Sequence, residues 1–102
     1  MRYRLSRSAE NDLAEIWNYT VQSWGEPQAE KYLKGLEARF LELADNPDQG
    51  KARKDLSPEY RSYHEARHVL FYSQHNDGIA IARVLHERMD LVERLEDDPG
   101  FG

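Results

Sequence analysis

The apolar residues of this 102-residue chain change their spacing near residue 46, and this change constrains the fold more than any other feature. Between residues 9 and 44 they recur every three or four positions, which is the spacing of an amphipathic helix. Between residues 60 and 86 they form short runs rich in β-branched and aromatic residues, which is typical of strands. Helices followed by neighbouring strands indicate an α+β domain.

The first half predicts a short strand over residues 2–5 and then a helical hairpin. Gly25 suits the end of one helix and Pro27 the first turn of the next, so the two helices meet in a tight link. The core-facing arc of the first helix, roughly 80° wide, holds Ala9, Leu13, Ile16, Thr20 and Trp24. The apolar face of the second holds Ala29, Tyr32, Leu33, Leu36, Phe40, Leu43 and Ala44. This helix is expected to stop before Asp45-Asn46-Pro47.

The second half predicts a loop or an irregular edge over residues 46–59 and then three antiparallel strands. The strand-like runs are Tyr60 to Glu65, His68 to Gln74 and Ile79 to His86, and the last two flank a turn at residues 75–78. We therefore expect an N-terminal strand, a helical hairpin and a three-strand meander, with both helices on one face of the sheet and the other face open. We expect residues 1–102 to form one domain, with a short helix over residues 89–97 and a frayed tail from about residue 96.

Composition narrows the classes of function. The net charge of −5 disfavours general nucleic-acid binding, because an acidic chain repels the phosphate backbone. No cysteine is present, which excludes disulfides and thiolate chemistry. The opening residues lack the apolar run of a signal peptide, and no apolar run approaches the ~20 residues of a membrane span, so we expect a soluble cytoplasmic protein.

A set of residues spread over nearly the whole chain resembles one family. In the first half the set comprises Tyr3, Leu5, Ala9, Asp12, Leu13, Ile16, Tyr19, Trp24-Gly25, Ala29, Tyr32, Leu36, Phe40, Leu43, Pro47 and Gly50. In the second half it comprises Arg61, the run from His68 to Tyr72, the run from Ile81 to His86, and Met89-Asp90. In this order and spacing the set resembles the ParE toxins of the ParE/RelE superfamily.

The resemblance implies a function that composition does not show. ParE toxins poison DNA gyrase by binding, without hydrolysing a bond, and a ParD antitoxin encoded beside them neutralises them. Such an antitoxin wraps a flexible segment around the toxin, and its folded part dimerises and binds operator DNA. The expected partners are therefore a ParD-like antitoxin and DNA gyrase, with DNA contacted indirectly through the antitoxin and with no membrane partner. No cofactor, metal or catalytic residue is expected.

The main alternative is a RelE-like toxin that cleaves messenger RNA on the ribosome. Such cleavage needs an acid, a base and cations. The cations available are Lys51, Arg53, Lys54, Arg61 and Arg83, and the candidate acids and bases are His64, His68 and His86. The acidic charge and the ending Glu87-Arg88-Met89-Asp90 weigh against this hypothesis. The second alternative is a homologue that binds an antitoxin and has lost toxicity.

Interface candidates follow from amphipathicity and from the last strand. The candidates for antitoxin contact are partly exposed aromatics, neighbouring apolar residues and two arginines: Trp17, Tyr19, Val21, Trp24, Leu41, Arg53 and Arg61. The candidates for target contact lie at the end of the last strand: Arg83, His86, Arg88 and Met89. Arg83 is predicted on the strand face of Ile79, Ile81 and Leu85, where it either contacts the target or pairs with Asp12, Glu65 or Asp90.

Overall fold

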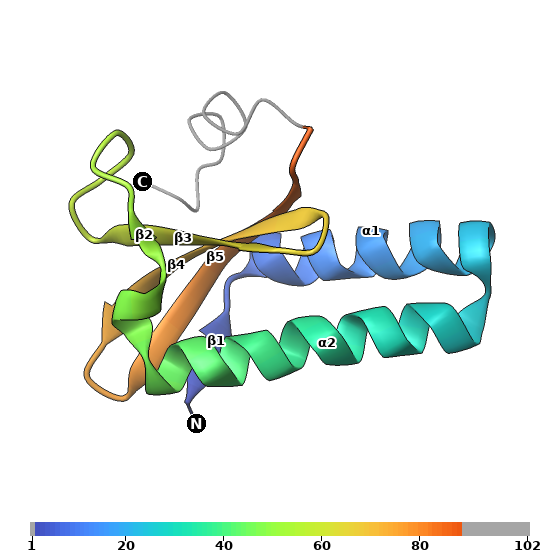
Figure 1. Ribbon diagram of the computed structural model, residues 1–102, viewed down its shortest axis with the longest axis horizontal. Helices are drawn as coiled ribbons and strands as arrows, with labels where there is room; N and C mark the ends of the chain where they lie inside the picture. Colours follow the sequence, from blue (N-terminus) through green and yellow to red (C-terminus); the bar gives the residue numbers. More distant parts are fainter. Residues whose placement is uncertain (1, 89–102) are drawn as a thin grey trace.

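A computed structural model describes residues 2–88 of the chain (Figure 1). In chain order its elements are β1 (Tyr3–Leu5), α1 (Arg7–Trp24), α2 (Glu26–Asp45), a 3₁₀ turn η1 (Pro47–Gln49), β2 (Lys51–Ala52), β3 (Tyr60–Glu65), β4 (His68–His75) and β5 (Gly78–His86). The predicted order of strand, helical hairpin and meander is confirmed. The two-residue strand β2 was not predicted, because its sequence is polar and lies in a loop. The helix and frayed tail expected beyond Met89 lie outside the described residues.

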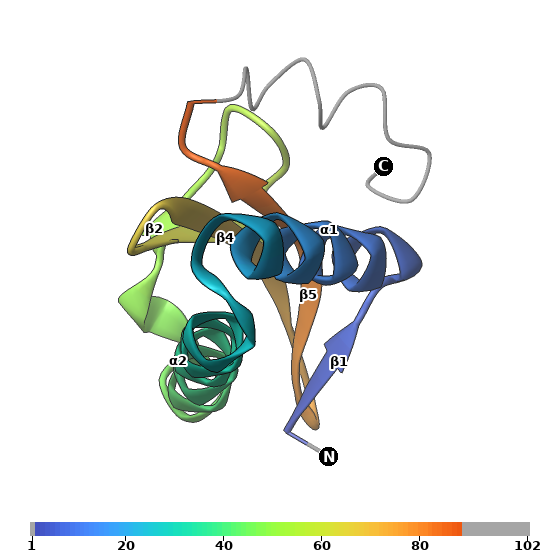
Figure 2. The same cartoon turned by 90° about the vertical axis from the view of Figure 1, so that its right-hand side faces the viewer.

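The sheet has five strands in the order β1-β5-β4-β3-β2. Strands β2 to β5 pair antiparallel with their neighbours, whereas β1 pairs parallel with β5. Both helices pack on one side of the sheet, as Figure 2 shows when the hairpin is viewed end-on. The predicted α+β layer arrangement is confirmed.

Local signals in the sequence set the ends of the helices. Ser6 caps α1, and its hydroxyl oxygen accepts a hydrogen bond from the backbone N–H of Ala9 at 3.0 Å. Gly25 separates the helices with φ = 92°, a left-handed conformation that glycine adopts without strain. Pro27 then lies in the first turn of α2, where the missing N–H costs no hydrogen bond.

The main core lies between the helices and the sheet. Its buried members are Ala9, Ile16, Leu36, Phe40, Leu43, Leu70, Tyr72, Ile79, Ile81 and Val84. The helices extend past the strands at the Gly25 end of the hairpin (Figure 1), so the last turn of α1 has no sheet beneath it. Trp24 is therefore 70% exposed although it falls on the predicted core arc, and its assignment to the core was wrong.

The sheet face away from the helices is not fully open as expected, because a second, smaller core covers part of it. Phe71 and Leu85 are fully buried on the side away from the main core, although no helix within residues 2–88 covers them. They pack against four partly buried residues, Leu56, Tyr60, Val69 and Ala82. The segment between β2 and β3 supplies Leu56, so a loop covers the part of this face that we expected to be bare.

Candidate functional site

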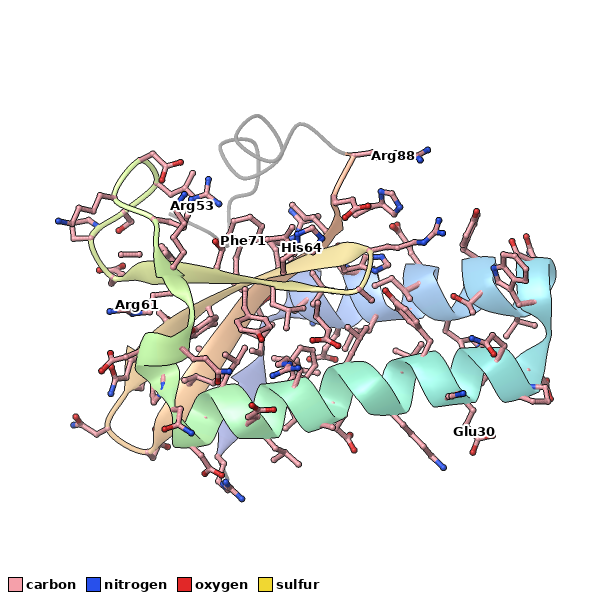
Figure 3. The ribbon with its side chains drawn as sticks, in the orientation of Figure 1. Glu30, Arg53, Arg61, His64, Phe71 and Arg88 are labelled. Carbon is pink, nitrogen blue, oxygen red and sulfur yellow. The ribbon has the colours of Figure 1, made fainter. Side chains whose placement is uncertain are left out.

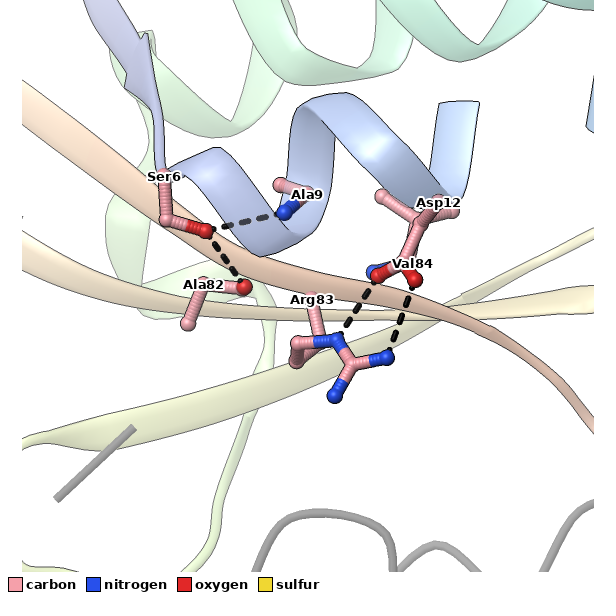
Figure 4. A network of polar contacts seen from close by, with 6 residues as sticks. All are labelled: Ser6, Ala9, Asp12, Ala82, Arg83 and Val84. Atoms are coloured by element: carbon pink, nitrogen blue, oxygen red, sulfur yellow. Dashed lines mark hydrogen bonds and ion pairs between the residues drawn. The ribbon is translucent and has the colours of Figure 1, made fainter. Parts of the chain in front are cut away.

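Asp12 connects α1 to the edge of β5 and is the most buried acidic residue in the described chain (Figure 4). Its carboxylate accepts two hydrogen bonds from the Arg83 guanidinium, at 2.8 Å from Nε and 2.9 Å from Nη2. Its Oδ2 also accepts the backbone N–H of Val84 at 2.9 Å. Strand β1 pairs with β5 only along residues 79–81, so Asp12 serves as the hydrogen-bond acceptor that a neighbouring strand would otherwise supply to Val84. Of the alternatives left open for Arg83, the structure shows the ion pair with Asp12.

The strand face predicted for Arg83 was wrong because β5 contains a bulge. Phe71 and Tyr72 are neighbours on β4, yet they pair with Arg83 and Ile81, so Ala82 is an extra residue. One extra residue reverses the face of every side chain that follows it. Ile81 and Val84 consequently lie in the main core, whereas Leu85 lies in the second core and Arg83 pairs across from Phe71.

Two histidines and a tyrosine meet where α2 approaches the β3–β4 turn. The Tyr32 hydroxyl lies 2.6 Å from Nδ1 of His68, and the rings of His68 and His86 meet edge-on with centroids 5.5 Å apart. Burial, reinforced by the neighbouring His86, lowers the pKa of His68 from 6.5 to about 4. His68 is therefore neutral near pH 7, as expected of a structural histidine bonded to Tyr32.

We expect the stability of the fold to decrease as the pH falls from 6.5 towards 4. In this window the unfolded chain protonates His68 and the folded chain does not, so the free energy of unfolding falls by up to about 1.4 kcal/mol per pH unit. The whole interval corresponds to about 3 kcal/mol, which solvent screening of the partly exposed ring lowers to about 2 kcal/mol. Below about pH 4 both states bind the proton and this contribution levels off. Urea unfolding of wild type and His68→Gln between pH 7 and 5 measures the difference. His75→Gln, at the exposed end of β4, is the matched control, and parallel curves for wild type and His68→Gln would contradict the prediction.

Three candidate antitoxin contacts form an exposed stripe along α1. Trp17, Val21 and Trp24 are spaced four and three residues apart, which places them on one side of the helix. Trp17 is 36% exposed and Trp24 70%, while Val21 is half-buried. We call these three residues the α1 stripe. Tyr19, 70% exposed, lies on the opposite flank of α1, and Leu41, 38% exposed, lies on α2 and points away from the core as predicted.

The two arginines in the same set are held by groups of the chain itself (Figure 3). Arg53 donates to the Asp55 carboxylate at 2.8 and 3.0 Å, and its guanidinium lies 5.4 Å from the centroid of the Phe71 ring. Arg61 donates to the backbone oxygen of Gly50 at 2.7 Å. These bonds hold the backbone in place on either side of β2. The Arg53 guanidinium also covers Phe71 of the second core.

The candidate target contacts differ in how accessible they are. The Arg83 side chain is 12% exposed and is held by Asp12, and His86 is partly buried beside His68. Arg88 is exposed after the end of β5, and in Figure 3 its side chain points away from the body of the protein. Met89 lies outside the described residues. Arg88 is thus an exposed cation at this end of the sheet, as is Arg67 of the β3–β4 turn.

The residues that a nuclease would need are only partly brought together, because His68 and His86 meet beside Tyr32 whereas His64 lies apart from them. His64 bonds to Glu87 at 2.6 Å and is paired across from Val69 of the second core, whereas His68 faces α2. The chain reverses between these two histidines, yet they lie on opposite faces of the sheet. Among residues 2–88 no group of three or more His, Asp or Glu side chains is placed to hold a metal ion.

No helix in the same range has the length and apolar character needed to span a membrane.

Comparison with known proteins identifies the family. The family model described as "ParE toxin of type II toxin-antitoxin system, parDE" matches residues 3–91. The chain belongs to the ParE toxin family. It is 42% identical to Toxin ParE1 of Mycobacterium tuberculosis over 92% of this chain and 97% of that protein. It is 40% identical to Toxin ParE1 of Caulobacter vibrioides over 91% of this chain and 96% of that protein.

A solved structure supports the fold of this ParE-family chain. The structure titled "Chromosomal ParDE TA system from P. aeruginosa" matches with a TM-score of 0.70, covering 84% of this chain and 95% of that one. At 22% sequence identity, this likeness concerns the fold alone. The resemblance drawn from the sequence is confirmed by the family match, and the chain is a toxin of a type II toxin-antitoxin system.

Sequence reasoning about this ParE-family chain missed two features. The hydroxyl of the buried Tyr72 accepts the backbone N–H of Gly50 at 2.9 Å and donates to the backbone oxygen of Pro47 at 2.7 Å, fixing the turn before β2. A Cβ at Gly50 would lie 2.2 Å from that hydroxyl, so glycine is required there. The second missed feature is a depression over Gly35, because periodicity carries no signal for a residue without a side chain.

Proposed function

We propose that this toxin inhibits DNA gyrase in the cytoplasm by binding it, and that a ParD-like antitoxin neutralises the toxin. Membership of the ParE family is the observation that carries the proposal. The geometry supports a binding mechanism, because His64 and His68 lie on opposite faces of the sheet and Arg53 and Arg83 are each held by a carboxylate. The net charge of −5 supports contact with DNA through the antitoxin rather than directly.

The proposed contacts divide between two regions. For the antitoxin we propose the exposed aromatic and apolar side chains of the hairpin, Trp17, Tyr19, Val21, Trp24 and Leu41, with Arg53 and Arg61 at the opposite end of the fold. For gyrase we propose the end of β5 and the residues that follow, with Arg88 and Met89 in contact and Arg83 and His86 shaping the strand that presents them. Both are surfaces for binding proteins and need no bond chemistry.

A supercoiling assay with purified components tests the proposal. We expect the toxin to inhibit gyrase-dependent supercoiling of a relaxed plasmid and, after detergent and protease treatment, to leave linear DNA from trapped cleavage complexes. Adding the product of the neighbouring antitoxin gene should restore supercoiling. Messenger RNA cut on translating ribosomes, with gyrase unaffected, would instead establish the RelE-like nuclease. Absence of both effects would establish a homologue that has lost toxicity.

Arg88 provides a single-residue test of the target surface. We expect Arg88→Ala to raise the toxin concentration needed for half-inhibition of gyrase by about fivefold to tenfold, because an exposed interface cation contributes through charge complementarity. Arg7→Ala, which removes an exposed arginine at the start of α1, is the matched control and should leave the inhibition unchanged. Equal inhibition by wild type and Arg88→Ala would show that Arg88 does not contact the target.

A further inference from the structure

A small depression lies between α2 and the β3–β4 turn. Its walls are Gln28, Lys31, Tyr32 and Gly35 of α2 with Glu65 and Ala66 of the turn, and its volume is about 190 Å³. Two contacts hold the turn against the helix, the bond between Tyr32 and His68 and the ion pair between Arg39 and Glu65 at 2.8 Å. The volume is below the roughly 300 to 1,000 Å³ of sites for drug-sized ligands, so the depression suits a single side chain.

Gly35 on the helical wall has no role in packing within the chain. It lies in the middle of α2, where glycine is less stable than alanine because of its backbone entropy. A Cβ built at Gly35 meets no atom within 4 Å, so an alanine would fit the folded chain without a clash. Glycine here keeps the depression open and otherwise weakens the helix.

On the opposite wall, Ala66 occupies a position where glycine would be more stable. Its φ of 54° is left-handed, a conformation in which alanine is strained and glycine is not. Glycine therefore occupies the helical wall where alanine would be more stable, and alanine occupies the turn where glycine would be more stable. On both walls of the depression the residue present is less stabilising than the alternative. Residues that reduce stability in this way are typical of binding surfaces, so we interpret the depression as a surface that contacts a partner.

The chemistry of the depression indicates the kind of group it accepts. The buried side chain of Leu36 also lines it, so its floor is apolar. Two polar groups of the walls are engaged, since Glu65 pairs with Arg39 and Tyr32 bonds to His68. Lys31 and the nearby Arg67 form no ion pair with any residue in the range 2–88. The Glu87 carboxylate also lies near Tyr32 and is bonded to His64 at 2.6 Å, so two cations and one carboxylate give this rim a positive net charge, although the whole chain is acidic.

We propose that this depression receives one apolar side chain from a helical segment of the antitoxin, with a carboxylate of the same segment beside Lys31 and Arg67. The proposal rests on neutralisation by an antitoxin, as put forward above. An apolar anchor flanked by acidic residues matches both the apolar floor and the cationic rim, which is the pattern of an amphipathic helix bound in a groove.

Filling the depression separates its effect on stability from its effect on binding. We expect Gly35→Leu to keep or raise the melting temperature, while weakening binding of the purified product of the neighbouring antitoxin gene by at least tenfold in calorimetric titration. The matched control is Glu30→Leu, which adds a leucine to the same helix at an exposed site whose side chain points away from the body of the protein in Figure 3. It should leave binding within about twofold of wild type.

Two further variants keep the test decisive. Lys31→Glu should weaken antitoxin binding about threefold to tenfold at low salt and less at high salt, and this variant decides the question if Gly35→Leu fails to fold. Ala66→Gly should raise the melting temperature by a few degrees. Wild-type affinity in a folded Gly35→Leu variant, or loss of gyrase binding alone, would overturn the proposal. Failure of the wild-type toxin to bind the antitoxin would instead contradict the proposed function.

Discussion

Replacing Asp12 with alanine is expected to destabilise the fold by about 3 to 5 kcal/mol, because it removes one partner of a buried ion pair. The Arg83 side chain is 12% exposed and would lose both hydrogen bonds from its guanidinium to Asp12. The backbone N–H of Val84 would lose its acceptor as well. A domain of this size has about 5 to 15 kcal/mol of stability, so the variant is expected to be marginally folded at 37 °C.

Urea unfolding of wild type and Asp12→Ala measures this loss. Glu15→Ala, which removes an exposed carboxylate from the same helix, is the matched control and should change stability by less than about 0.5 kcal/mol. The double variant Asp12→Ala with Arg83→Met should recover part of the loss, because no charge is then left buried without its partner. A loss below about 1 kcal/mol in Asp12→Ala would show that the pair does not anchor α1 to β5.

The Asp12 anchor also explains how Arg83 relates to the target surface. Two of its three guanidinium nitrogens bond to Asp12, so their geometry is fixed by the helix. We infer that Arg83 fixes the direction in which β5 ends and so the position of Arg88. A loss of gyrase inhibition in an Arg83 variant is therefore interpretable only beside a measurement of its folded fraction.

The fold was predictable where one residue determines the local backbone. Gly25 and Pro27 marked the link of the hairpin, and the turn after His75 marked the β4–β5 connection, since both depend on conformations that few residues adopt. The bulge at Ala82 was not predictable, because alternation counted along one strand assumes a regular ladder. Because of that single extra residue, the prediction that Arg83 lies on the same strand face as Ile81 was wrong.

The exposed side chains of the candidate site were predictable where the amphipathic pattern of a helix determines which residues face solvent. The flank positions of α1 correctly indicated exposed Trp17 and Tyr19. The exposure of Trp24 depends on how far the hairpin extends past the sheet, which is a property of the whole fold. The depression over Gly35 depends on a turn about thirty residues away in sequence, so no local pattern could predict it.

Combined replacement of Trp17 and Trp24 with alanine is expected to weaken antitoxin binding by about 100-fold to 1,000-fold. Large exposed aromatics are typical binding hot spots, each contributing about 2 kcal/mol or more. The fold should lose much less than it would from a core substitution, because Trp24 is 70% exposed and Trp17 36%. Gln22→Ala, an exposed position on another side of the same helix end, is the matched control.

Intrinsic fluorescence measures this interaction directly, because Trp17 and Trp24 are the two tryptophans of the chain and both are exposed on α1. If the antitoxin covers the α1 stripe, adding a tryptophan-free antitoxin should shift the emission to shorter wavelength and reduce quenching by iodide. The shift should saturate at the stoichiometry found by calorimetry. A complex that forms with wild-type affinity while both tryptophans stay accessible to iodide would place the antitoxin elsewhere, because a covered indole cannot remain in contact with a soluble quencher.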